Sequence, residues 1–347
     1  MPVLLACRTG LGLVYFIENT AAQASRPAVS DEIGWRPLGG AARYPEKMYQ
    51  IVNVEREPTQ PEQLGSKRKF WFTGDDGTPV LFKEGRPNTG ENWAEKVACE
   101  LCNLLALPHP HYELAAWRGT KGVVTKSFVP PDGRLVFGNE LLARFVKGYA
   151  AERVYRQTQH TVTAVIAILR TNTIMLPRGH SSEAIARAAD TFVGYLMLDA
   201  WIGNTDRHHE NWGLLVIPPR RIELAPTFDH ASSLGREETD ERRMERLVTK
   251  DKRRSVDAYA ARARSAFFRS PADKRPLSTL DAFLFAARFR RCAAAFWLDR
   301  LSNMEWRRIE AIFGEMPRSE MSEVCQTFAR KLLAINQHRL LALRSAL

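Results

Sequence analysis

Residues 203–215 read GNTDRHHENWGLL and lie between a long apolar run and a short strand-like segment. They contain one Asp, two His and two Asn, side chains that carry protons or bind metal ions. Two reaction classes use such a cluster: phosphoryl transfer, and metal-dependent cleavage of a phosphodiester. The rest of the chain has to distinguish between them.

The composition is that of a soluble globular protein, with 347 residues, 45% apolar and 26% charged. The chain is long enough for two lobes with a sizeable core. No apolar run reaches the roughly 18 residues of a transmembrane helix, and no basic segment precedes the apolar N-terminus as in a signal peptide. We therefore expect a cytoplasmic protein without a membrane partner. The net charge is +11, but Lys and Arg are scattered, so direct nucleic acid binding is not expected to be the main role.

Strand-like and helical patterns divide the chain near residue 130. Residues 69–83 and 112–128 each resemble a β-hairpin, and a helix is expected between them over residues 91–106, with Thr89 as its N-cap. Cys99 and Cys102 fall within that helical pattern and are expected to be packed rather than metal-bound. After Pro130, helices are expected at residues 139–145, 153–169 and 182–202 and through the last hundred residues. A small β-rich lobe, residues 1–129, should therefore precede a helical lobe, residues 130–347.

The cluster fits phosphoryl transfer. Asp206 and Asn211 are five residues apart, which is the Asp-to-Asn spacing of a kinase catalytic loop. A hairpin and then FDHASSLG follow, in which Asp229 is placed like the principal Mg²⁺ ligand of kinases. Lys83 ends the strand VLFK, and Glu95 follows twelve residues later on the expected helix. Periodicity does not separate Glu95 from Glu91 and Glu100 as the partner of that lysine.

A candidate phosphate loop lies upstream, in LGSKRKFWF. A glycine followed by several cations can cover phosphates with backbone N–H groups and positive charge. The loop is neither a Walker A motif nor a kinase G-x-G-x-x-G motif. Its residues are Gly65, Ser66, Lys67, Arg68 and Lys69.

Together these segments resemble the HipA-like serine/threonine kinases over about residues 62–235, through GSKRKFWF, the run from LFKEG to HYELA, GVVTKSF, IGNTDRHHENWGLL and FDHASSLG. The resemblance implies an α+β bilobal protein-kinase-like fold and an ATP- and Mg²⁺-dependent kinase that acts on Ser or Thr of an unknown protein and on itself. It implies that Asp206 is catalytic and that Asn211 and Asp229 bind Mg²⁺. It further implies Lys83 on the ATP phosphates with Glu95 as its partner, the loop from Gly65 to Lys69 around the phosphates, and an adenine-binding hinge at Lys126, Ser127 and Phe128.

The sequence departs from the family at two places. HipA toxins carry an autophosphorylated Ser just before the phosphate loop, whereas this chain has PEQLG there, so Ser66 is the nearest hydroxyl and our hypothesis for an inhibitory autophosphorylation site. The first 45 and last 100 residues match nothing familiar, so an antitoxin-like or regulatory partner is an expectation from the family alone.

Other interpretations stay open. The cluster is also typical of an HNH-like nuclease, in which a His acts as base, and a phosphatidylinositol-type lipid kinase shares a compact D-R-H-x-x-N loop. A non-catalytic pseudokinase module is the third alternative. Of His208 and His209, we expect one to support the loop by hydrogen bonding and the other to lie on the surface, and we expect His230 to serve packing.

Overall fold

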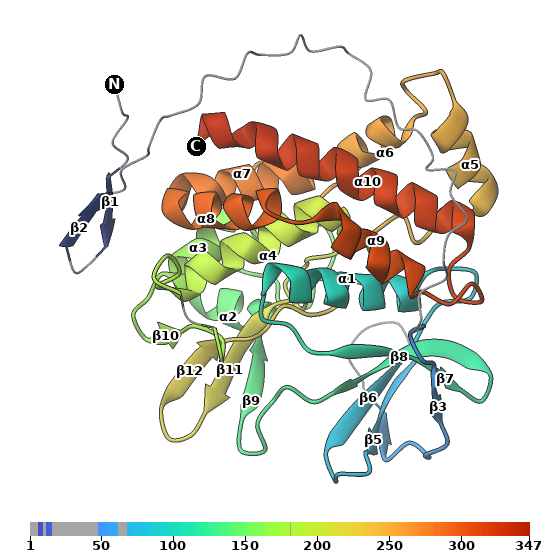
Figure 1. Ribbon diagram of the computed structural model, residues 1–347. Coiled ribbons are helices and arrows are strands. Elements are labelled where there is room, and N and C mark those ends of the chain that lie inside the picture. Colours follow the sequence, from blue (N-terminus) through green and yellow to red (C-terminus); the bar gives the residue numbers. More distant parts are fainter. Residues whose placement is uncertain (1–5, 10–11, 16–47, 62–67, 181) are drawn as a thin grey trace. The chain divides into compact units, whose positions relative to one another are not determined.

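The computed structural model describes residues 6–9, 12–15, 48–61, 68–180 and 182–347 (Figure 1). The chain forms two compact units, Met1–Tyr44 and Pro45–Leu347. In the first, β1 (Ala6–Thr9) and β2 (Gly12–Tyr15) pair as an antiparallel hairpin. None of the helices within these described ranges is long and apolar enough to span a membrane.

A six-stranded sheet opens the second unit, in the order β3-β7-β8-β6-β5-β4. Its strands are β3 (Val52–Val54), β4 (Gln60–Pro61), β5 (Lys69–Thr73), β6 (Pro79–Glu84), β7 (Tyr112–Trp117) and β8 (Thr120–Lys126). Alternating residues such as Phe70, Phe82 and Trp117 form an apolar cluster on one face. Because Phe82 belongs to that cluster, the next residue, Lys83, is presented to the opposite face.

The helix α1 (Glu91–Leu105) packs on β7 and β8 and also contacts α9 (Figure 1). The expectation that Thr89 caps it is wrong: the N-cap is Gly90, without a side-chain cap, and the Thr89 hydroxyl donates instead to the Arg86 carbonyl (2.8 Å). Cys99 and Cys102 are buried free thiols within the helix. Nearly all faces of α1 are covered, so its polar residues need partners inside the protein.

A smaller sheet, in the order β10-β12-β11-β9, follows in the helical part of the chain. Its strands are β9 (Arg134–Phe137), β10 (Ile174–Met175), β11 (Gly213–Ile217) and β12 (Arg221–Leu224). The helices are α2 (Gly138–Phe145), α3 (Val162–Leu169), α4 (Ala188–Ile202), α5 (Asp240–Val248), α6 (Val256–Arg262), α7 (Thr279–Phe289), α8 (Arg291–Ser302), α9 (Trp306–Gly314) and α10 (Glu323–Leu341), followed by the 3₁₀ helix Ala342–Ala346. The predicted lobe boundary at residues 129 and 130 falls between β8 and β9 and stays a prediction.

The main core surrounds α4, which contacts α3, α7, α8 and α10 and is buried along its whole length. It begins later than the predicted residue 182, because the Asp190 carboxylate accepts the N–H groups of Ala186 (3.2 Å) and Arg187 (3.0 Å) and starts the helix there. Likewise α3 begins at Val162, where the Thr161 hydroxyl caps it, rather than at residue 153. Gly203, in the left-handed conformation (φ 67°), ends α4 and opens the loop that follows.

The six-stranded sheet is attached to the helical region through Glu320, in the turn before α10. One Glu320 oxygen accepts a hydrogen bond from the Asn92 amide on α1 (2.5 Å), and the other lies 3.2 Å from the Lys121 ammonium on β8. A backbone bond from Tyr49 N–H to the Glu315 carbonyl (2.8 Å) lies near the same turn. We call these contacts the Glu320 attachment.

Candidate active site

Lys83 lies between two carboxylates that come from distant parts of the sequence. Its ammonium nitrogen is 3.1 Å from Glu95 Oε2 on α1 and 2.9 Å from Asp229 Oδ1, in the segment after β12. Lys83 and Glu95 are buried, whereas Asp229 keeps 24% of its side chain exposed. The structure therefore brings three predicted site residues into direct contact and leaves one carboxylate accessible from outside.

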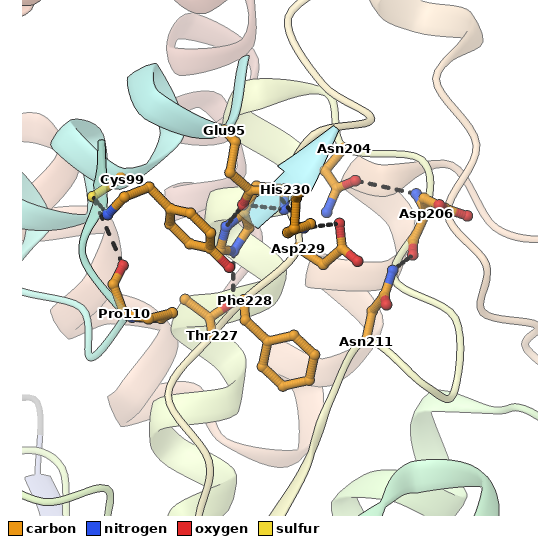
Figure 2. Close-up of polar contacts among 12 residues, drawn as sticks. Glu95, Cys99, Pro110, Asn204, Asp206, Asn211, Thr227, Phe228, Asp229 and His230 are labelled. Carbon is orange, nitrogen blue, oxygen red and sulfur yellow. Dashed lines mark hydrogen bonds and ion pairs between the residues drawn. The ribbon is translucent and has the colours of Figure 1, made fainter. Parts of the chain in front are cut away.

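Glu95 is held on its second oxygen by His230. The His230 backbone N–H donates to Glu95 Oε1 (2.7 Å), its ring Nδ1 lies 3.4 Å from the same oxygen, and Nε2 is 2.8 Å from the Thr227 hydroxyl (Figure 2). His230 is buried, in line with the expected packing role, and both of its ring nitrogens also have polar neighbours. His230 connects Glu95 to the chain on either side of Asp229.

These contacts keep the cluster charged. Burial would lower the pKa of the Lys83 ammonium, but the Asp229 and Glu95 carboxylates raise it well above its usual value. Burial would raise the pKa of Glu95, but the Lys83 charge and the hydrogen bond to His230 lower it to about 2. At neutral pH Lys83 is a cation and Glu95 an anion.

Asp206 and Asn211 are fixed within one loop by hydrogen bonds among its own residues. The Asp206 N–H donates to Asn204 Oδ1 (3.1 Å), and the Asn211 side-chain nitrogen donates to the Asp206 carbonyl (2.7 Å), as Figure 2 shows. A carbonyl oxygen only accepts hydrogen bonds, so the side-chain atom of Asn211 that faces it must be the nitrogen Nδ2. The other atom of the amide, Oδ1, is therefore the one that can accept a hydrogen bond or bind a metal ion. The Asp206 side chain is 34% exposed.

Sequence reasoning missed the buried ion pair beneath this loop. Two of the three guanidinium nitrogens of Arg207 donate to the Asp199 carboxylate, Nε at 2.8 Å and Nη2 at 2.7 Å. Arg207 Nη1 donates to the carbonyls of Asn211 (2.9 Å) and Phe228 (3.3 Å). Arg207 thereby ties the loop of Asp206 to the residue before Asp229. A lone Asp within the apolar run YLMLDAWI was the available signal, because a buried carboxylate requires a partner.

A second network that the sequence did not reveal begins at Glu91, which is buried. Its carboxylate accepts the Arg86 backbone N–H (3.0 Å) and pairs with the guanidinium of Arg236. Arg236 Nη2 also donates to the Ser232 hydroxyl (3.3 Å), which in turn lies 3.5 Å from Asp206 Oδ2. The segment after Asp229 is thus connected both to the start of α1 and to Asp206.

The predicted hinge begins at Lys126, the last residue of β8. The Lys126 ammonium pairs with Asp76 in the turn between β5 and β6, and the Ser127 N–H donates to the Pro79 carbonyl (2.9 Å). Phe128 stacks on Phe228, with ring centroids 5.6 Å apart. Of the hinge residues, Phe128 thus lies beside the residue before Asp229, while the Lys126 side chain contacts the β5–β6 turn.

The phosphate loop can be placed only in part, because Gly65, Ser66 and Lys67 lie outside the described residues. Lys69 on β5 lies directly opposite Lys83 on β6 in the antiparallel strand register. The Arg68 guanidinium lies over the Trp117 ring, 4.6 Å from its centroid.

The two histidines of the loop are both buried, so the expectation that one lies on the surface is wrong. His209 Nδ1 is 2.7 Å from the Tyr149 hydroxyl, and burial together with the neighbouring His208 lowers the pKa of His209 to about 4. His208 Nδ1 accepts the Glu210 N–H (3.2 Å), and its Nε2 lies 4.0 Å from Asp206 Oδ1. Both rings support the loop, which weakens their interpretation as nuclease residues.

Three solved structures are similar to this chain to different degrees. CtkA, a proinflammatory kinase of Helicobacter pylori, has a TM-score of 0.65 at 20% identity, over 85% of this chain and 99% of its own. HipA of Shewanella oneidensis MR-1, solved with HipB and operator DNA, has a TM-score of 0.48 at 12% identity, over 84% and 67%. A Golgi casein kinase has a TM-score of 0.39 at 13% identity, over 86% and 74%.

The similarity to CtkA confirms the expected α+β protein-kinase-like fold. A search of the curated proteins gave no match. A family model described as the HipA-like C-terminal domain matches residues 52–318, well over half of the chain. The chain therefore belongs to the family of HipA-like C-terminal domains.

Proposed function

We propose that the protein is a kinase that transfers the γ-phosphate of ATP to a Ser or Thr hydroxyl of a protein. The observation that carries the proposal is the contact of Lys83 with both Glu95 and Asp229, beside a loop that holds Asp206 and Asn211. Phosphoryl transfer needs a cation for the phosphates, oxygen ligands for a metal ion and a carboxylate at the acceptor hydroxyl. Lys83 is the cation, Asp229 and Asn211 offer the metal ligands, and Asp206 is the carboxylate at the acceptor. Glu95 positions Lys83.

Mg²⁺ fits the donor set. It prefers oxygen ligands, and the Asp229 carboxylate and the Asn211 Oδ1 are such groups. The bond from the Asn211 nitrogen to the Asp206 carbonyl orients that amide. When bound, the metal would neutralise charge on the phosphates. Asp229 and Asn211 are the residues that would hold it.

The roles of the remaining residues follow from their chemistry. Lys83 binds phosphate oxygens with a charge that its two carboxylate neighbours maintain. Asp206 orients the acceptor hydroxyl and receives its proton, as a bond forms between the acceptor oxygen and the γ-phosphorus. The bond from that phosphorus to the β–γ bridging oxygen breaks, and ADP leaves. The segment Lys126, Ser127 and Phe128 would bind adenine, with Lys69 and the loop before it near the phosphates, so that ATP lies between the predicted lobes.

The test is transfer of label from γ-labelled Mg·ATP by the purified full-length chain, to itself or to an added protein. Asp206→Ala should leave nucleotide affinity nearly unchanged and lower the transfer rate by roughly 10²–10⁴. Asp229→Asn should weaken Mg·ATP binding, because it removes a charged oxygen ligand.

Transfer at the original rate by Asp206→Ala would refute its role, and unchanged metal-dependent affinity in Asp229→Asn would refute the metal site. Phosphatidylinositol vesicles and DNA serve as further substrates. Label on lipid alone, or DNA cleavage without ATP, would replace this function by one of the alternatives; nucleotide binding without any transfer would indicate a pseudokinase.

Self-phosphorylation extends the proposal, with Ser66 as the candidate residue. Phosphate there, within the proposed phosphate loop, would repel ATP from the pocket. Mass spectrometry after incubation with Mg·ATP tests this directly, and phosphate found elsewhere with Ser66 unmodified would contradict it. The antitoxin-like partner and the cytoplasmic location remain predictions.

A further inference from the structure

A cavity of about 260 Å³ lies beside the loop that carries Asp206. Thr205, the residue before Asp206, lines it, and so does Ser232, whose hydroxyl is 3.5 Å from Asp206 Oδ2. A backbone bond from the Thr205 N–H to the Ser232 carbonyl (3.2 Å) joins these two walls. A group bound in the cavity would therefore be next to the proposed acceptor position.

The other walls come from α6 and α10 and from α5. Buried Ala260 and Leu332 give an apolar lining, and Arg246 and Arg262 bring two guanidinium groups. Small-molecule pockets usually enclose roughly 300–1,000 Å³, so this cavity suits one or two side chains rather than a nucleotide. Its mixed lining fits a side chain with an apolar stem and a charged end.

The lining carries two guanidinium groups, those of Arg246 and Arg262, and one carboxylate, that of Glu237, which accepts the Tyr259 hydroxyl (2.7 Å). Residues 236–264 carry ten Lys and Arg side chains and seven Asp and Glu side chains. Arg246 is neutralised by Glu238, which it binds at 2.9 and 3.2 Å. Arg262 is different: its Nη2 donates to the Arg253 carbonyl (2.6 Å), and no carboxylate within the described part of the chain forms an ion pair with it. A guanidinium has five N–H donors, and this bond uses one.

We propose that this cavity receives an acidic side chain of the protein substrate, close in sequence to the Ser or Thr acceptor, and that Arg262 binds its carboxylate. The proposal rests on the proposed kinase function and adds a substrate class to it: hydroxyl acceptors flanked by Glu or Asp. Arginine binds carboxylates through charge-assisted hydrogen bonds, which give geometric selectivity as well as affinity.

The experiment uses the full-length chain and synthetic peptides with a single Ser, which differ only in having Glu, Ala or Lys at one flanking position. Two quantities are measured: kcat/KM for label transfer from Mg·ATP, and peptide affinity by fluorescence anisotropy without ATP. At one flanking position Glu should exceed Lys by about tenfold in both. Arg262→Glu should reverse this preference and leave Mg·ATP affinity unchanged. Arg264→Glu is the matched control, since Arg264 is exposed nearby but does not line the cavity.

The outcomes separate the two proposals. Transfer without a charge preference, or with the same preference in Arg262→Glu, would overturn the acidic subsite and leave the kinase function intact. Preferential binding of Glu peptides that depends on Arg262, without any transfer, would uphold the subsite and refute the kinase function. Reversal by Arg264→Glu as well would attribute the preference to general surface charge and also overturn the subsite.

Discussion

Replacing Asp199 by Asn would leave the Arg207 guanidinium buried without its counter-charge. Arg207 is 1% exposed and Asp199 3%, and two short hydrogen bonds join them. Removing one partner of a buried pair costs about 3–5 kcal/mol, because the remaining charge loses both solvent and its ion. The unfolding entropy is about 2.1 cal/mol/K per residue, so for a unit of about 300 residues the midpoint should fall by roughly 5–8 °C.

Urea and thermal unfolding followed by tryptophan fluorescence measure this loss. Asp251→Asn is the matched control, because its partner Arg253 is 88% exposed and solvent-exposed ion pairs contribute little to stability. A loss of less than about 1 kcal/mol in Asp199→Asn would refute the reasoning, since the pair would then behave like one on the surface.

A double variant separates stability from positioning. Asp199→Leu with Arg207→Met replaces both charges by apolar groups, which often restores the stability of a buried pair. The double variant should still transfer phosphate more slowly than the parent protein, because the bonds from Arg207 to the Asn211 and Phe228 carbonyls are lost. Full recovery of transfer together with stability would show that Arg207 does not position the site.

Three further changes test other parts of the site. Gly122→Ala would place a Cβ 2.3 Å from the Lys83 carbonyl, so we expect a loss of about 1–3 kcal/mol in urea unfolding and weaker Mg·ATP binding; unchanged values would contradict this close approach. Glu95→Gln should lower the unfolding free energy by about 1–3 kcal/mol and slow label transfer, whereas transfer at the parent rate would argue against its positioning of Lys83. His160 accepts the Trp212 indole N–H (3.2 Å), and burial lowers its pKa from 6.5 to about 3, so the unfolded state gains the proton first and stability falls as the pH drops from about 6.5 toward 3. His160→Gln should make that fall shallower in unfolding measured against pH, and an identical pH dependence would contradict it.

The order of the site segments along the chain was predictable, because each segment is recognised from residues that are close together in the sequence. The loop containing Asp206, the hairpin and the segment of Asp229 follow one another along the chain, and each has local turn and strand signals. The resemblance to HipA-like kinases, which that order and the β-rich segment before it carry, implied the kinase-like fold. What the sequence could not supply was the pairing of side chains that are distant along the chain.

The three glutamates of α1 illustrate the difference. Periodicity left Glu91, Glu95 and Glu100 equivalent, since all three flank the apolar face. The structure gives each its own cation: Arg236 for Glu91, Lys83 for Glu95 and Lys96 for Glu100. Local spacing contains only the pair of Lys96 with Glu100, four residues apart on the helix, because Lys83 and Arg236 reach the helix from opposite sides of the sequence.

The Glu320 attachment has a mechanical consequence for the sheet. Glu320 fixes β8 and α1 to the turn before α10, and the covalent segment between β8 and β9 fixes the same sheet a second time. The contacts of Lys83 with Asp229, of Glu95 with His230 and of Glu91 with Arg236 join the same sheet and α1 to the segment around Asp229. These contacts start from β6, β8 and α1, whereas β5 and β4 form the edge of the sheet beyond them. A displacement of the edge formed by β5 and β4 would therefore leave the ion pairs of Lys83 and Glu95 in place, whereas a displacement of β6 or α1 would break them.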